Sequence, residues 1–276
     1  MEVIDSKPFY EFELNMLALL QCDNNNMREL ITDLYKINKN CHEEYSAIIN
    51  TSLSINNRIK KTIEKELETY RRHINEMLED KDFDEEDDYN IYKISQMVSL
   101  REDGFRLLER GIEIQSISSI VMLLSLLEST LFEIINKFSS FDKEKFPDIK
   151  SVYKRDKGIA KYLKYLDKYL NEVEENFIVG KPIYNELLHW ANLRNNIVHS
   201  SNRYNDELYA KSLKLNIQIK YSRRYNKFCF ETKSVIQLGI LVGQILNICI
   251  VEGFYKYFGE DFLEISETFS PPIIID

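Results

Sequence analysis

The sequence is poor in the residues that make turns and cross-links. It holds only 8 Gly and 5 Pro among 276 residues, too few for a collagen-like chain, a flexible linker protein or a loop-rich β fold. Its 4 Cys stand apart without a CxxC pair, so they indicate neither a disulfide framework nor a zinc site. We expect small buried thiols in a reducing, cytoplasmic compartment.

Several signatures of catalysis and targeting are also missing. The chain has no glycine-rich phosphate loop, no HExxH pair, no four-ligand zinc pattern and no GxSxG turn. We therefore expect no metal and no cofactor. The first residues are acidic and precede no apolar core, so we expect no signal peptide either.

The charge of the chain is unevenly distributed. Hydrophobic residues make up 44% and charged residues 29%, a composition typical of a folded chain. The net charge is −9, but residues 1–90 contain 11 Lys/Arg against 21 Asp/Glu, and the remainder is nearly neutral. An acidic chain is a poor general binder of nucleic acid. A neutral C-terminal region can still carry a local basic groove, so we expect an acidic helical region at 1–90 and a second domain at 91–276.

The acidic region has the periodicity of long helices. Two apolar stripes within residues 27–79 predict an antiparallel helical pair. Eight of the ten residues 79–88 are acidic, which favours a solvated linker, the alternative being an arm that binds a partner. The stripes consist of Met27, Leu30, Ile31 and Leu34, and of Ile55, Ile59, Ile63, Leu67, Tyr70, Ile74 and Met77.

The second region predicts an all-α fold, a helical bundle with one small β-hairpin. Helical patterns cover 112–138, 159–170 and 182–198, and alternation from Leu213 to Tyr221 predicts a strand, giving a hairpin near 213–231. Residues 235–258 form an apolar helix containing Gly239 and Gly243. Its apolar part is slightly short for a membrane span and holds Gln and Asn, so we expect it buried inside the bundle, with no membrane partner.

A basic stripe follows one face of the predicted helix at 159–170. Lys157, Lys161, Lys164 and Lys168 are spaced by 4, 3 and 4 residues, so they share a face. Lysines commonly decorate a solvated face. The alternative is a substrate-binding surface that follows the phosphates of an RNA strand.

Arg194 is the anomalous residue of the helix at 182–198. At about 100° per residue it falls within the apolar stripe that contains Leu187 and Trp190. A buried guanidinium is costly unless it is paired or used. It either pairs with Glu128, holding two helices together, or contacts a substrate, and the two roles are compatible.

His199 follows in the same helix but points elsewhere. It lies roughly 140° from Arg194 around the axis, so the two converge only if the helix frays near Val198 or if two copies cross in a twofold dimer. Arg stabilises a phosphodiester transition state, and His transfers protons to and from RNA oxygens. Alternatively, His199 only stabilises the helix C-terminus. We expect His189 to be exposed and without a role, and Trp190 to lie in the core.

The segment Arg194-Asn195-Asn196-Ile197-Val198-His199 resembles the R-(polar)-x(3–5)-H motif of the HEPN superfamily. Asn195 fits the polar position, and Glu128 resembles the acidic position of the family's first helix. One toxin subgroup carries Tyr two residues after the His, where this chain has Ser201. The resemblance therefore points to the wider family and covers roughly residues 91–270.

The resemblance implies a helical bundle that forms a homodimer and cleaves RNA without a metal. Arg194, His199 and Asn195 would be catalytic, and Glu128 would support them. Such proteins are often toxins or effectors of antiphage defence, so residues 1–90 would bind an antitoxin or a regulatory protein. Two alternatives stay open: a non-catalytic dimerisation or partner-binding module, and a nucleotide-sensing module.

Overall fold

The computed structural model describes residues 9–14, 16–79, 88–152, 158–170, 178–258 and 263–268. These residues form a mostly helical molecule with two small sheets. The all-α prediction is therefore confirmed. Most of the expected acidic linker, residues 80–87, lies outside the described residues, as does Lys157.

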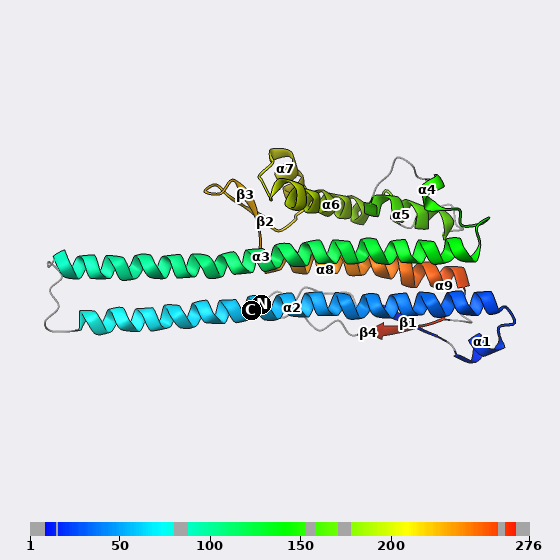
Figure 1. Ribbon diagram of the computed structural model, residues 1–276, viewed down its shortest axis with the longest axis horizontal. Coiled ribbons are helices and arrows are strands. Elements are labelled where there is room, and N and C mark those ends of the chain that lie inside the picture. Colours follow the sequence, from blue (N-terminus) through cyan, green and yellow to red (C-terminus); the bar gives the residue numbers. More distant parts are fainter. Residues whose placement is uncertain are drawn as a thin grey trace.

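Two long antiparallel helices form the frame of the molecule (Figure 1). They are α2, Asn25–Leu78, and α3, Asp88–Phe141, and a short helix, α1, Met16–Gln21, precedes them. The side chain of Asn24 caps α2 by accepting from the N–H groups of Asn26 and Met27. The expected helical pair within 27–79 is wrong. With no Gly or Pro between residues 25 and 78, the helix continues unbroken, and its partner is α3.

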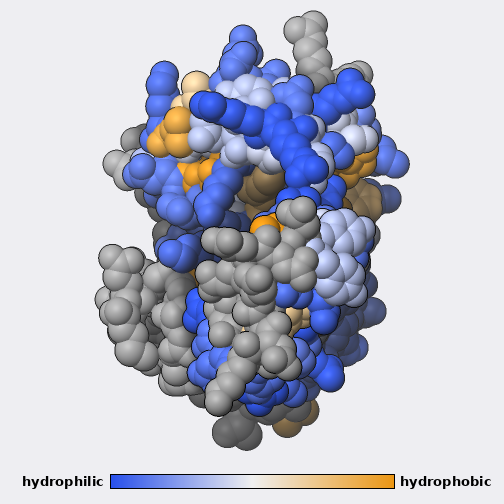
Figure 2. All heavy atoms as spheres, turned by 90° about the vertical axis from the view of Figure 1, so that its left-hand side faces the viewer, coloured by the Kyte–Doolittle hydropathy of each residue, from blue (hydrophilic) through white to orange (hydrophobic). Residues whose placement is uncertain are grey.

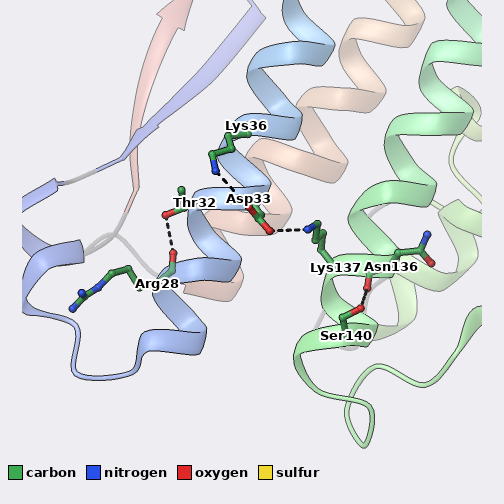
Figure 3. Close-up of polar contacts among 7 residues, drawn as sticks. All are labelled: Arg28, Thr32, Asp33, Lys36, Asn136, Lys137 and Ser140. Atoms are coloured by element: carbon green, nitrogen blue, oxygen red, sulfur yellow. Dashed lines mark hydrogen bonds and ion pairs between the residues drawn. The ribbon is translucent and has the colours of Figure 1, made fainter.

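Figure 3 shows polar contacts near the end where α2 begins, one of which, between Asp33 and Lys137, joins the two helices. Asp33 of α2 accepts a hydrogen bond of 2.7 Å from Nζ of Lys137 on α3, and Lys36 lies 3.7 Å from the same carboxylate. These cations hold the pKa of Asp33 below its usual range, chiefly through the bond from Lys137. The charges therefore favour this pairing of the two helices.

The opposite halves of α2 and α3 form a two-helix arm. Among the side chains whose burial is described, the last buried one of α2 is Asn56 and the first of α3 is Ser116. Beyond these positions, the described side chains of residues 57–79 and 89–115 are half-buried or exposed. In Figure 1 this arm extends past the other elements of the bundle.

A third helical layer lies along α2 and α3. It comprises α8, Thr232–Leu246, the π-helix η1, Asn247–Glu252, and α9, Gly253–Phe258. At Gly239 the layers approach closely, because the Tyr45 hydroxyl donates to the Gly239 carbonyl at 2.9 Å. A Cβ atom at Gly239 would lie only 2.7 Å from Cδ1 of Ile49. The absence of a side chain at Gly239 is therefore what lets α8 lie this close to α2.

Within the described ranges, two helical stretches are long and apolar enough to cross a membrane, residues 89–141 and 232–249. Half of the apolar window of the first and 67% of that of the second are buried within the bundle. Core helices pass the same test of length and composition. Since α8 contacts α2, α3 and α6, it is placed as the buried helix that its sequence predicted.

The remaining helices and one hairpin cover the face of α3 that is turned away from α2 (Figure 1). They are α4, Ile149–Val152, α5, Gly158–Tyr169, α6, Pro182–Ser200, α7, Asp206–Lys214, β2, Ile219–Ser222, and β3, Lys227–Phe230. The hairpin prediction is confirmed, but its expected start is wrong. The Asn205 side chain caps the start of α7 by accepting from the Leu208 N–H at 2.9 Å. This helix runs through Leu213 and Lys214, where the strand was expected to begin.

A second sheet, which the sequence did not predict, joins the two ends of the described chain. Strand β1, Phe9–Leu14, pairs antiparallel with β4, Leu263–Thr268. The register runs from Phe9 opposite Thr268 to Leu14 opposite Leu263. This sheet lies beside α2, on the face opposite α6 (Figure 1).

Candidate functional site

Arg194 lies where α6 packs on α3. Its Nη2 donates a 3.0 Å hydrogen bond to Oε2 of Glu128. The side chains are 22% and 28% exposed, so the pair is protected but reaches the surface. The expected contact between Arg194 and Glu128 is therefore present, and it links the two helices.

Helix α5 completes the surroundings of the Glu128 carboxylate. Gly158, the first residue of α5, has φ +59°, and a Cβ atom there would lie 3.3 Å from Oε1 of Glu128. One turn later, burial raises the pKa of Tyr162, and the negative charge of Glu128 raises it further. Three helices thus meet at one carboxylate, which fixes the position of Arg194.

The guanidinium keeps hydrogen-bonding capacity beyond this ion pair. Among the described residues, the buried Nε of Arg194 has no hydrogen-bond partner, and neither does the buried Oδ1 of Asn196, two residues on. A guanidinium has five N–H donors in a planar fork that matches the oxygens of a phosphate. Arg194 is therefore a cation held in place, and because its Nε is buried, only the part of the guanidinium that reaches the surface is open to an anion.

Asn195 and His199 are both exposed on α6. The helix stays regular to Ser200 and ends where Ser201 and Asn202 adopt φ of 50° and 62°. Fraying near Val198 is therefore excluded, and one chain does not aim Arg194 and His199 at a single point. By helical spacing Val198 falls on the same apolar stripe as Leu187 and Trp190, which predicts burial, but it is 55% exposed, so this prediction is wrong.

His189 is a second correction, because it is fully buried rather than exposed. Its Nε2 lies 2.7 Å from Oγ of Ser212, which itself donates to the Leu208 carbonyl at 2.8 Å. The Ser212 oxygen therefore accepts from a neutral His189 that carries its proton on Nε2. Burial, followed by the charge of Lys211, lowers the pKa of His189 to about 4. The expectation failed because α7 covers this side of α6, and α7 had been assigned in part to a strand.

The described part of the basic stripe lies on α5, but its members differ in exposure. Lys161 and Lys164 are half-buried, whereas Lys168 is exposed, with Nζ 4.9 Å from the centre of the Tyr169 ring. The helix is anchored by Asp167, whose Oδ1 accepts from the Ile178 N–H at 3.1 Å. These three lysines thus share the outer face of a helix that begins beside the Glu128–Arg194 pair.

The cysteines are free and none stands near this pair in the sequence. Cys41 and Cys249 are buried, as expected, whereas Cys22 and Cys229 are half-buried. Burial raises the pKa of the Cys41 thiol to about 11. Within the described ranges, no group of three or more His, Cys, Asp or Glu side chains is arranged to hold a metal ion.

The site as a whole is a positioned Arg194 with an exposed imidazole at the end of the same helix. Trp190, fully buried beneath it, belongs to the core as predicted. No family model, no curated protein and no solved structure matches the chain.

Proposed function

We propose that the protein is a metal-independent endoribonuclease of the HEPN type, acting as a homodimer and serving as a toxin or antiphage-defence effector. One observation carries the proposal: Glu128 holds the Arg194 guanidinium at the surface of α6, and the exposed His199 ends the same helix. A fixed cation and a titratable imidazole are the two groups that cleavage of an RNA phosphodiester needs.

The chemistry follows from these two side chains. Arg194 donates to the non-bridging oxygens of the scissile phosphate and stabilises the charge that develops on them. One His199 takes the proton of the ribose 2′-hydroxyl, whose oxygen attacks the phosphorus. The P–O5′ bond breaks, and a second, protonated imidazole gives a proton to the leaving 5′-oxygen. The products carry a 2′,3′-cyclic phosphate and a 5′-hydroxyl.

Two copies of α6 supply the second imidazole. Because the helix is regular to Ser200, Arg194 and His199 of one chain diverge, and a twofold axis beside α6 brings two of each into one cleft. The exposed Val198 next to His199 provides apolar surface for such a contact. Asn195, exposed beside Arg194, orients the phosphate. Val198→Asp should therefore yield a monomer by sedimentation and abolish cleavage.

The surrounding regions receive supporting roles. Lys161, Lys164 and Lys168 line the outer face of α5 and guide the substrate toward the pair at its start, with Lys157 extending the stripe in sequence. Residues 1–90 bind an antitoxin or a regulatory protein. Since α2 and α6 lie on opposite faces of α3 (Figure 1), such a partner would regulate the site without covering Arg194 directly.

The test is incubation of purified protein with mixed RNA in EDTA, followed by analysis of product ends. Cleavage with cyclic phosphate ends should survive chelation. It should disappear in Arg194→Ala and His199→Ala and persist in His73→Ala, which removes an exposed imidazole from the arm. Intact RNA with the folded, dimeric wild type would count against the enzyme.

A second candidate is a non-catalytic partner-binding module, or one that senses nucleotides. The Glu128 pair already gives Arg194 a structural role. The arm also exposes apolar side chains, including Tyr89, Ile91, Tyr92 and Leu107, that suit a protein contact. This candidate predicts a stable complex with a partner and unchanged RNA.

A further inference from the structure

A concentrated positive charge surrounds the β2–β3 hairpin, apart from the basic stripe on α5. Between Arg203 and Lys227 there are seven Lys/Arg and two Asp/Glu, a local net charge of +5 on a chain of net charge −9. We name the hairpin surface by five residues: Arg203, Arg223, Arg224, Tyr225 and Lys227. All are exposed except Lys227, which is half-buried.

The hairpin is fixed to the turn that follows His199. Two hydrogen bonds join Asn202 and Phe228: the Phe228 N–H donates to the Asn202 carbonyl at 3.1 Å, and the Asn202 side-chain amide donates to the Phe228 carbonyl. The Tyr204 N–H donates to the Asn226 carbonyl at 3.0 Å. An isolated bridge joins Arg203 to Lys227. The hairpin surface is therefore held at the end of α6 where His199 lies.

The cations of the hairpin surface form no ion pairs within the described part of the chain. Among the described residues, no carboxylate forms an ion pair with Arg203, Arg223, Arg224 or Lys227, whereas the neighbouring Lys220 pairs with Glu231. Figure 2 looks at this end of the molecule and shows mostly hydrophilic side chains in its upper part, where the hairpin and α7 of Figure 1 lie. Uncompensated arginines of this kind suit phosphate groups.

Aromatic rings accompany these cations. Tyr225 at the tip of the hairpin is 56% exposed, and the Arg224 guanidinium lies 5.6 Å from the centre of its ring. Below it, the rings of Tyr204 and Tyr221 pack 4.0 Å apart at an interplanar angle of 33°. The Tyr221 hydroxyl donates to Oδ1 of Asn226 at 3.2 Å, which fixes the turn. A rigid turn thus presents one open ring between cations.

We propose that single-stranded RNA binds the hairpin surface, with phosphates on the arginines and a base stacked on Tyr225. Cations along a backbone path with interleaved aromatic rings are the features by which proteins bind single strands without sequence preference. A duplex would hide its base faces from Tyr225. The inference rests on the proposed function, because the hairpin surface then delivers the strand to His199.

The experiment measures binding in a protein that does not cut. Fluorescence anisotropy of a labelled 20-nucleotide single-stranded RNA is followed in EDTA with His199→Ala as the parent. To this parent are added Arg223→Glu/Arg224→Glu, the milder Arg223→Gln/Arg224→Gln, or Tyr225→Ala. The matched control is Arg71→Glu/Arg72→Glu, an equal charge reversal at two exposed arginines on the arm. Circular dichroism and urea midpoints verify that each variant folds.

We expect Arg223→Glu/Arg224→Glu to weaken RNA binding at least about tenfold and to reduce its salt dependence. Tyr225→Ala should weaken binding about fivefold or more. The control on the arm, Arg71→Glu/Arg72→Glu, should bind RNA as the parent does. Equal binding by the hairpin variants and the parent would overturn the inference. So would displacement of the RNA by poly-L-glutamate at equal charge, because the surface would then fit any acidic partner. If the parent binds at the hairpin but wild type cuts no RNA, only the ribonuclease proposal fails. If wild type cuts RNA and the hairpin variants bind it normally, only this inference fails.

Discussion

Replacing His189 with Gln should remove a specific acid sensitivity from the protein. The imidazole is fully buried, and its pKa is lowered from 6.5 to about 4. Above pH 6.5 it is neutral in both the folded and the unfolded chain and contributes no pH dependence. Between pH 6.5 and 4 the unfolded chain binds a proton that the folded chain does not, so stability falls as the pH falls.

The magnitude follows from the difference of the two pKa values. About 2.5 pH units at about 1.36 kcal/mol per unit gives roughly 3 kcal/mol lost between pH 6.5 and 4. Gln keeps an N–H that can donate to Ser212 but cannot titrate. The variant should therefore lose roughly 2–3 kcal/mol less than wild type between pH 7.5 and 4.5.

Urea unfolding followed by circular dichroism at several pH values measures these free energies directly. The control is His73→Gln, at an exposed site on the arm, which measures how the loss of an accessible imidazole changes these free energies. Parallel pH curves for wild type and His189→Gln would refute the reasoning, because the buried imidazole would then have no part in the acid response.

Three further predictions concern packing, the ion pair and the thiols. Gly239→Val should lower the free energy of unfolding by about 1–3 kcal/mol, because a Cβ atom there meets Ile49 at 2.7 Å; urea unfolding measures it, and an unchanged midpoint would contradict the close contact. Glu128→Gln should lower the free energy of unfolding by about 1–2 kcal/mol in the same assay. It should also reduce RNA cleavage at least about tenfold, as expected for a mispositioned catalytic group. Full activity would show that the pair does not position Arg194. Native alkylation, followed by mass spectrometry, should modify the half-buried Cys229 before the buried Cys41, and the reverse order would contradict this packing.

Local signals in the sequence were sufficient for the helix that carries the site. Pro182 marks the start of α6 because it suits a first helical turn. The position of Arg194 on an apolar stripe required a counter-charge, and Glu128, which follows the apolar run of α3, was the predicted partner. The start of α6 could be predicted from one residue and its neighbours in the sequence. The ion pair could be predicted because a buried cation needs a partner of opposite charge.

The features that the sequence did not reveal depend on competition or on distant contacts. The alternation from Leu213 to Tyr221 fits a strand. In the structure, Asn205 caps the start of α7 instead, and the helix runs through Lys214. Burial of His189 depends on that helix lying over α6. One long helix and a pair of shorter antiparallel helices have the same apolar periodicity, and the structure has the single long helix α2. The Asn205 cap and the lack of Gly and Pro in α2 are local signals for the first and the last of these features, whereas the burial of His189 depends on a tertiary contact.

The pairing of β1 with β4 has a consequence for the order in which the molecule is assembled. Residues 9–14 leave the ribosome early, but their partner strand, residues 263–268, is translated about 250 residues later. Closing so long a segment is entropically unfavourable and slow compared with local helix formation. The sheet of β1 and β4 therefore forms late during biosynthesis, after the helices that precede β4 have emerged. Until β4 has been translated, the backbone edge of β1 that pairs with it stays without this partner.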